Sequence, residues 1–149
     1  MEYTDLNRTC LTEYAEVFVE ALNAPPWNDR WDISCTTARL KDIFDTPGFL
    51  GVAACDGQQC VGFAAGCTEK WQDSTVYYLR EMCVVPARQQ SGVGGRMLAA
   101  LLDRLQAAGV TSIYLLTARG SLAENFYAKM GFAVSERMIM MKRQLVPDT

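Results

Sequence analysis

Gly92 and Gly94 lie between an apolar, strand-like run and a long helical pattern, in a segment with the composition of a phosphate-binding loop. A helix start offers unpaired N–H groups and about half a positive charge, and glycine lets an anion approach the backbone closely. No Lys-Ser or Lys-Thr pair completes a P-loop, and Met97 stands where a dinucleotide fingerprint needs its third glycine. The spacing indicates either a diphosphate cradle or a tight turn with close helix packing.

A longer match surrounds these glycines. Residues 84–94 read V-V-P-A-R-Q-Q-S-G-V-G, and residues 126–132 read F-Y-A-K-M-G-F. The first stretch resembles the acetyl-CoA signature of the GNAT N-acetyltransferase superfamily, which is V-x-P, a short turn, and then Q or R, x-x-G-x and G or A. The second resembles the F-Y-x-K-x-G-F of the same family, and the resemblance covers about residues 49–145. Gly120 departs from the family, in which an asparagine that contacts the cofactor is common at this position.

The resemblance implies transfer of an acetyl group from acetyl-CoA to an amine. In such proteins the strand before the glycine loop and the strand after its helix splay apart, and the pantetheine arm bonds to the exposed edge like an added strand. In this chain that edge would consist of Cys83, Val84 and Val85. The expected cradle is Gln89, Gln90, Ser91, Gly92, Val93, Gly94 and Gly95, with Arg96 either near a phosphate or simply exposed in the first helical turn.

Acetyl transfer needs a neutral amine, a stabilised oxyanion and a proton for the departing thiolate. Tyr127 matches the family's usual general acid, and an ordinary tyrosine pKa of about 10 lies above that of a thiol, so proton donation is feasible. The alternative for Tyr127 is a core tyrosine without a role in the reaction. The backbone N–H of Val84 is a candidate donor to the oxyanion.

Glu81 is the candidate general base, because many family members carry an acid at this position. Strand alternation places Glu81, Cys83 and Val85 on one face. The alternative is a surface carboxylate or an ion pair with Arg80, and a base can also act through water. Cys83 could in principle carry an acetyl group, but it has no His or Lys neighbour in the sequence to activate it, which favours a packed apolar thiol.

The acceptor is expected to enter over the first two helices, where residues 24–32 form a stiff aromatic and acidic loop. Trp27, Asp29 and Trp31 are the candidate acceptor-binding residues, because aromatic faces and carboxylates suit a cationic amine. Alternatively, the two tryptophans cap the core and the aspartates of this loop cap the helix that follows. The residues do not decide among a small amine, an aminoglycoside and a peptide.

Composition excludes several other classes. The chain has no histidine, which removes Ser-His-Asp and Cys-His catalysis and His-ligated zinc, and its six cysteines form no CxxC pair, so we expect no metal. A net charge of −3 disfavours nucleic acid as a partner. No apolar run approaches about 18 residues and no signal peptide is visible, so we expect no membrane association, a cytoplasmic location and reduced, mostly buried thiols.

These patterns predict a single domain over residues 1–149, with an α/β (α+β) fold: a mixed central sheet with helices on both faces and splayed strands around the cofactor. This order of elements fits the GNAT fold, in which homodimers are common. The competing functions are a peptide or protein N-acetyltransferase, a non-catalytic acyl-CoA sensor and a scaffold domain. The expected elements are a short strand at 2–5, helices at 11–22 and 35–44, strands at 49–55, 60–67 and 75–85, a helix at 93–108, a strand at 112–116, a helix at 121–130, and a last strand or hairpin at about 132–145.

Overall fold

The sheet lies within the first of two compact units of this computed structural model, which describes residues 1–147. The first unit is Met1–Leu116, and the second begins at Thr117. The strands are ordered β1-β2-β3-β4-β5; the first four are antiparallel, and β5 runs parallel to β4. The single domain expected over residues 1–149 stays a prediction. The strands are β1 (Glu2–Asp5), β2 (Phe49–Asp56), β3 (Gln59–Lys70), β4 (Thr75–Val84) and β5 (Ser112–Leu115).

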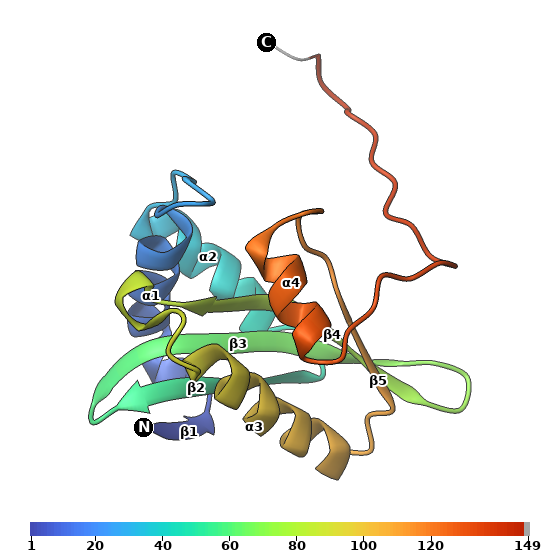
Figure 1. Cartoon of the computed structure of the whole chain (residues 1–149), viewed down its shortest axis with the longest axis horizontal. Helices are drawn as coiled ribbons and strands as arrows, with labels where there is room; N and C mark the ends of the chain where they lie inside the picture. Colours follow the sequence, from blue (N-terminus) through green and yellow to red (C-terminus); the bar gives the residue numbers. More distant parts are fainter. Residues whose placement is uncertain (148–149) are drawn as a thin grey trace. The chain divides into compact units, whose positions relative to one another are not determined.

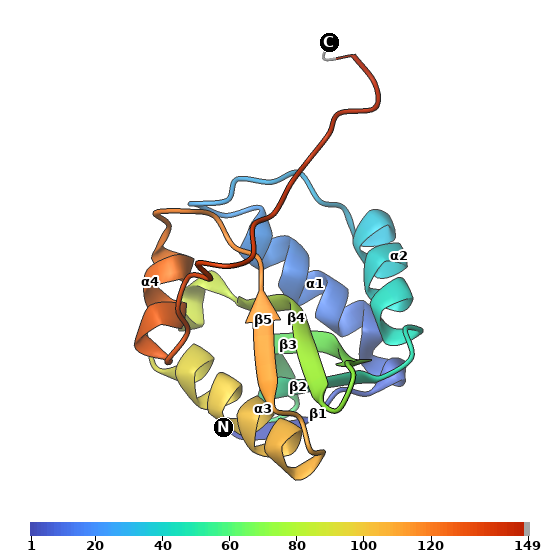
Figure 2. The same cartoon turned by 90° about the vertical axis from the view of Figure 1, so that its right-hand side faces the viewer.

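Helices cover both faces of this sheet, as predicted. The views in Figures 1 and 2 show α1 and α2 on one face and α3 on the other. The ring of Tyr14 in α1 contacts the rings of Phe44 in α2 and Phe63 in β3, which joins the three elements in one core. The helix bounds are α1 (Leu11–Leu22), α2 (Ile33–Phe44) and α3 (Val93–Ala107), with short 3-10 turns η1 (Arg8–Cys10) and η2 (Pro86–Arg88).

An extra residue in β4, Arg80, forms a β-bulge against β3, because Leu79 and Glu81 face consecutive residues of β3. A bulge changes which face the following side chains point to. Glu81 therefore points to the face covered by α1 and α2, the same face as Tyr78, although these two residues are an odd number apart. The sequence did not reveal this shift.

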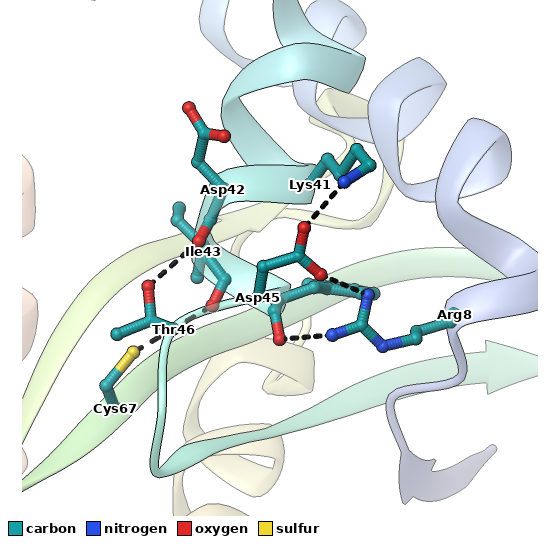
Figure 3. Close-up of polar contacts among 8 residues, drawn as sticks. Arg8, Lys41, Asp42, Ile43, Asp45, Thr46 and Cys67 are labelled. Atoms are coloured by element: carbon teal, nitrogen blue, oxygen red, sulfur yellow. Dashed lines mark hydrogen bonds and ion pairs between the residues drawn. The ribbon is translucent and has the colours of Figure 1, made fainter.

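Both ends of α2 are held by side chains. At its start the carboxylate of Asp32 accepts the N–H of Cys35 at 2.7 Å, so the helix begins two residues earlier than predicted. At its end Arg8 and Lys41 bind the carboxylate of Asp45 at 2.5 and 2.6 Å (Figure 3). These contacts, Lys41 first, lower the pKa of the Asp45 carboxyl. The helix is thus fixed at both termini.

The second unit contains one helix, α4 (Leu122–Lys129), within residues 117–147. A capping box begins this helix: the Ser121 hydroxyl accepts the N–H of Glu124 at 3.1 Å. The Glu124 carboxylate reaches back to the N–H of Gly120 at 2.9 Å. Gly131 has a φ of +94°, a conformation that favours glycine after a helix end.

The strand or hairpin predicted at about 132–145 is wrong, because residues 132–147 contain no strand. The hydroxyl of Ser135 accepts the N–H groups of Arg137 and Met138 at 3.3 and 2.9 Å. Such local bonds occupy donors that a sheet ladder would use. The apolar run at 138–141 resembles a strand in sequence, but a strand also needs a pairing partner.

Two further expectations concern membrane association and the burial of the cysteine thiols. Within residues 1–147 no helix has both the length and the apolar character that a membrane span requires. All six cysteines are free thiols, but only half of them are buried: Cys60, Cys67 and Cys83. Burial raises the pKa of the Cys60 thiol to about 12, which keeps it protonated.

Candidate active site

The glycine loop leads into α3 through a left-handed residue. Gly92 is the N-cap with a φ of +88°, which side chains other than glycine rarely adopt. Among the described residues, 1–147, no side chain caps this helix start, so the first-turn N–H groups are left to other acceptors. A Cβ placed on Gly92 would lie 3.4 Å from Cζ of Arg96, so the guanidinium sits directly beside the loop. The loop therefore combines a bare helix start with a cation.

The edge of β4 is open beyond the end of β5. The parallel pairing ends at Leu79 with Leu115, whereas β4 continues to Val84. The N–H of Val85 donates to Val61 in β3 at 2.9 Å, so the backbone groups of Val84, one residue earlier, point to the opposite edge. Nε2 of Gln89 donates to the Val84 carbonyl there, at 2.9 Å. The structure thus leaves a strand edge beside the glycine loop.

The chain itself organises the turn between this edge and α3. The hydroxyl of Ser91 donates to the carbonyl of Arg88 at 2.5 Å. Arg88 forms an ion pair with Asp56 in the β2–β3 hairpin, and Gln90 has a φ of +60°. These contacts shape the turn at residues 89–92, and α3 begins directly after it at Val93. The cradle role of Gln89 to Gly95 stays a prediction.

Glu81 is paired, but not with the residue considered from the sequence. Nε of Arg39 in α2 donates to Oε1 of Glu81 at 2.6 Å, and the Glu81 side chain is 14% exposed. Arg80 instead lies over the Tyr78 ring at 5.8 Å. Burial raises the pKa of Glu81, whereas the charge and hydrogen bond of Arg39, and the charge of Arg80, lower it. Glu81 is thus a buried carboxylate held by a cation.

Cys83 is packed in the core, with 8% of its surface exposed. Burial first, then the nearby Glu81 and Cys60, raise the pKa of its thiol well above the ordinary value. A protonated thiol is a poor nucleophile. The structure therefore supports the packed-thiol interpretation. Like those of Val85, the backbone groups of Cys83 face β3, so of the three residues expected at the open edge only Val84 presents its backbone there.

The candidate acceptor loop is partly structural. Asn23 fixes Trp31 through two hydrogen bonds to its backbone, both at 2.9 Å, and the Trp31 ring meets Phe18 edge-on at 5.1 Å. Nε1 of Trp31 donates to Asp29 at 3.1 Å. Trp27 is 40% exposed. Trp31 thus caps the core and Asp32 caps α2, as the alternative interpretation held, while Trp27 and Asp29 lie at the surface.

Arg39 joins this loop to the candidate base, and the sequence analysis missed it. Its guanidinium lies 5.9 Å from the centroid of the Trp31 ring while it binds Glu81. The available signal was weak: Arg39 follows the N-cap Asp32 by two helical turns and so lies on the same side of α2. Its partner on the sheet, Glu81, could not be identified from the sequence.

Tyr127 lies on α4 in the second unit. Its ring packs against Phe126 and Phe132 in tilted, edge-on contacts with centroids 5.2 and 5.5 Å away. These contacts hold the ring against its own helix. Its role as an acid stays a prediction. Among residues 1–147 no group of acidic, cysteine or histidine side chains has the arrangement of a metal site.

Comparison with known proteins places the chain in a known family. It matches the model of the Acetyltransferase (GNAT) family over residues 15–132. A comparison with curated protein sequences finds no match.

Solved structures share the fold. Aminoglycoside N-acetyltransferase AAC(6')-Iy in complex with CoA matches with a TM-score of 0.75 and 18% identity, over 96% of this chain and 94% of that chain. The aminoglycoside acetyltransferase meta-AAC0020 from an uncultured soil metagenomic sample, in complex with trehalose, has a TM-score of 0.74 and 14% identity, covering 97% and 96%. A transcriptional regulator from Bacillus halodurans C-125 has a TM-score of 0.76 and 16% identity, covering 95% and 99%. At such identities the likeness shows the fold alone.

Proposed function

Because this chain belongs to the GNAT acetyltransferase family, we propose that it transfers the acetyl group of acetyl-CoA directly to a primary amine, specifically a small cationic one. AAC(6')-Iy, whose fold is similar, has been crystallised with CoA. That complex supports acetyl-CoA as the donor. The aminoglycoside acetyltransferases among the similar structures support an acceptor that carries more than one amine.

One observation carries the proposal: the open edge of β4 at Val84 stands next to the uncapped start of α3 at Gly92. Acetyl-CoA joins an extended amide-containing arm to a diphosphate. A strand edge suits the arm, and a helix start with Arg96 beside it suits the diphosphate. The residues present therefore fit this donor.

When bound, acetyl-CoA supplies the thioester carbon that the amine attacks. Glu81 would first take one proton from the acceptor ammonium, because only a neutral amine has the lone pair needed for attack. The N–H of Val84 would donate to the carbonyl oxygen as negative charge develops there. The family resemblance implies Tyr127 as the source of the proton that the sulfur takes up as the C–S bond breaks. The attacking nitrogen loses its remaining excess proton to water.

Glu81→Gln tests the base directly. Glu81 acts only when deprotonated, so kcat/KM for the amine should fall as the pH drops through the raised pKa of this carboxyl. Gln keeps the shape but cannot take a proton, so kcat/KM should drop and its acidic limb should flatten. Glu16→Gln, an exposed substitution in α1, is the matched control and should leave the profile unchanged. If the pH profile of Glu81→Gln superimposes on that of the wild-type protein, Glu81 serves only as a structural ion pair.

An amine panel tests the activity as a whole. The protein is mixed with acetyl-CoA and with mono- and diamines, aminoglycosides or lysine peptides, and the released CoA thiol is measured. Release with small cationic amines is expected. Release only with peptides would make the chain a peptide N-acetyltransferase. Binding of acetyl-CoA in calorimetry with no release for any amine would identify a sensor, and no binding would contradict the proposal altogether.

A further inference from the structure

Within residues 1–147 the hydrogen bond and the ion pair that join Arg39 to Glu81 both involve Oε1 of the carboxylate. Nε of Arg39 donates to Oε1 at 2.6 Å, and its Nη2 makes an ion pair with the same Oε1. A fork-to-fork pair of arginine and carboxylate would engage both oxygens. Here Oε2 takes no part in the hydrogen bond or in the ion pair. The carboxylate is therefore fixed by one oxygen, and the other remains for a different partner.

The guanidinium of Arg39 is itself held from two directions. The ring of Trp31 lies beside it at 5.9 Å, and that ring is fixed by Phe18 and by the two backbone hydrogen bonds from Asn23. Arg39 also belongs to α2, whose start is fixed by the N-cap hydrogen bond from Asp32. A base supported by a locked neighbour keeps a defined direction for proton transfer.

The charges around Glu81 come from two elements. Arg39 faces it from α2, and Arg80 and the thiol of Cys83 lie near it on β4. Burial favours the neutral acid, whereas the two arginines favour the carboxylate. Of the two arginines, Arg39 lowers the pKa of Glu81 more, since it acts both by charge and by hydrogen bond. Without it, the carboxyl would need a higher pH to ionise.

We propose that Arg39 is a positioning residue for the acceptor half of the reaction: it holds Glu81 by Oε1 so that Oε2 receives the proton of the acceptor ammonium. In this step an N–H bond breaks, an O–H bond forms on Oε2, and the electron pair stays on the nitrogen. Arg39 remains protonated throughout. Through Trp31 it also joins the acceptor loop to the base. This inference rests on the proposed function.

The test compares Arg39→Gln with Arg39→Lys in pH profiles of kcat/KM for an amine that the wild-type protein acetylates. Arg39→Gln should lower kcat/KM about tenfold or more and move the acidic limb to higher pH, because the cation that favours the carboxylate is lost. Arg39→Lys keeps the charge, so the limb should return toward its original position. Its rate should recover only in part, because an ammonium lacks the planar donors of a guanidinium. KM for acetyl-CoA should stay unchanged in both variants.

Lys41→Gln is the matched control, because Lys41 lies on the same helix and pairs with Asp45 at the surface, away from Glu81. A pH profile of Arg39→Gln that superimposes on that of Lys41→Gln would overturn the positioning role and leave the proposed function standing. If Arg39→Gln does not fold, Arg39→Lys decides: a rate equal to wild type overturns the proposal. If the wild-type protein acetylates no amine but binds acetyl-CoA, the proposed function fails, and this inference fails with it.

Discussion

The donor half and the acceptor half of the candidate site are built differently. The donor half, residues 83–96, is made mainly of backbone groups: the strand edge at Val84 and the helix start after Gly92. The acceptor half is made of side chains, Trp31, Arg39 and Glu81, which come from a loop, a helix and a strand. A backbone site can be encoded by a short run of sequence, whereas a side-chain site depends on how distant elements pack.

Tyr127→Phe gives the largest expected effect and tests the side chain proposed as the general acid. Positioned acid catalysis contributes roughly 100-fold or more, so kcat should fall by about that factor. The KM for acetyl-CoA should change little, because the hydroxyl acts only as the thiolate forms. Steady-state kinetics measure both values. If the variant keeps the wild-type kcat, then either Tyr127 only packs against Phe126 and Phe132, or the chemical step is not rate-limiting.

A diamine compared with a monoamine of equal length probes the acceptor half. A second, distant ammonium can stay charged and meet the aromatic and acidic groups of Trp27 and Asp29. A cation–π contact is worth about 2 kcal/mol when desolvated and a surface carboxylate contact at most about 1 kcal/mol. Together they predict a preference of roughly tenfold to 100-fold in kcat/KM for the diamine, partly lost at high salt. Equal rates would make the loop purely structural.

Gly94→Asp should weaken acetyl-CoA binding and leave the acceptor half unchanged. The new side chain places a negative charge where the diphosphate is expected, so Kd should rise at least about tenfold, or 1.4 kcal/mol. Ala99→Asp, exposed on the same helix outside the loop, is the control and should bind normally. Calorimetry measures both. Unchanged affinity in a folded Gly94→Asp variant would contradict the cradle.

Asp32→Ala should produce the smallest effect, a modest loss of stability, and it tests whether the acceptor half and the donor half are independent. It removes the N-cap hydrogen bond of α2, which costs about 1 kcal/mol of stability and lowers Tm by roughly 2–8 °C. Acetyl-CoA affinity should be unchanged, because the loop and the strand edge lie on other elements. Differential scanning calorimetry and a binding titration check this. A loss of acetyl-CoA affinity would show that the halves are coupled.

The sequence predicted most elements of the fold. The helix predicted at residues 11–22 and the strands predicted at 49–55 and 112–116 agree with α1, β2 and β5 to within one residue. The prediction failed at residues 132–145, where apolar composition was read as a strand. Composition reports on the chain alone, whereas a strand exists only when another strand pairs with it.

What the sequence determined by itself is the donor half. Within the turn from Val85 to Gly92 the bonds of Gln89 to Val84 and of Ser91 to Arg88 are local, so the order of residues favours this conformation, which the ion pair of Arg88 with Asp56 supports from a distance. Tertiary structure decided the acceptor half. The bulge at Arg80 chose the face on which Glu81 lies, and the packing of α2 gave it Arg39 as partner. These two residues are 42 positions apart, and no local pattern encodes a contact that forms only when a helix packs against a sheet.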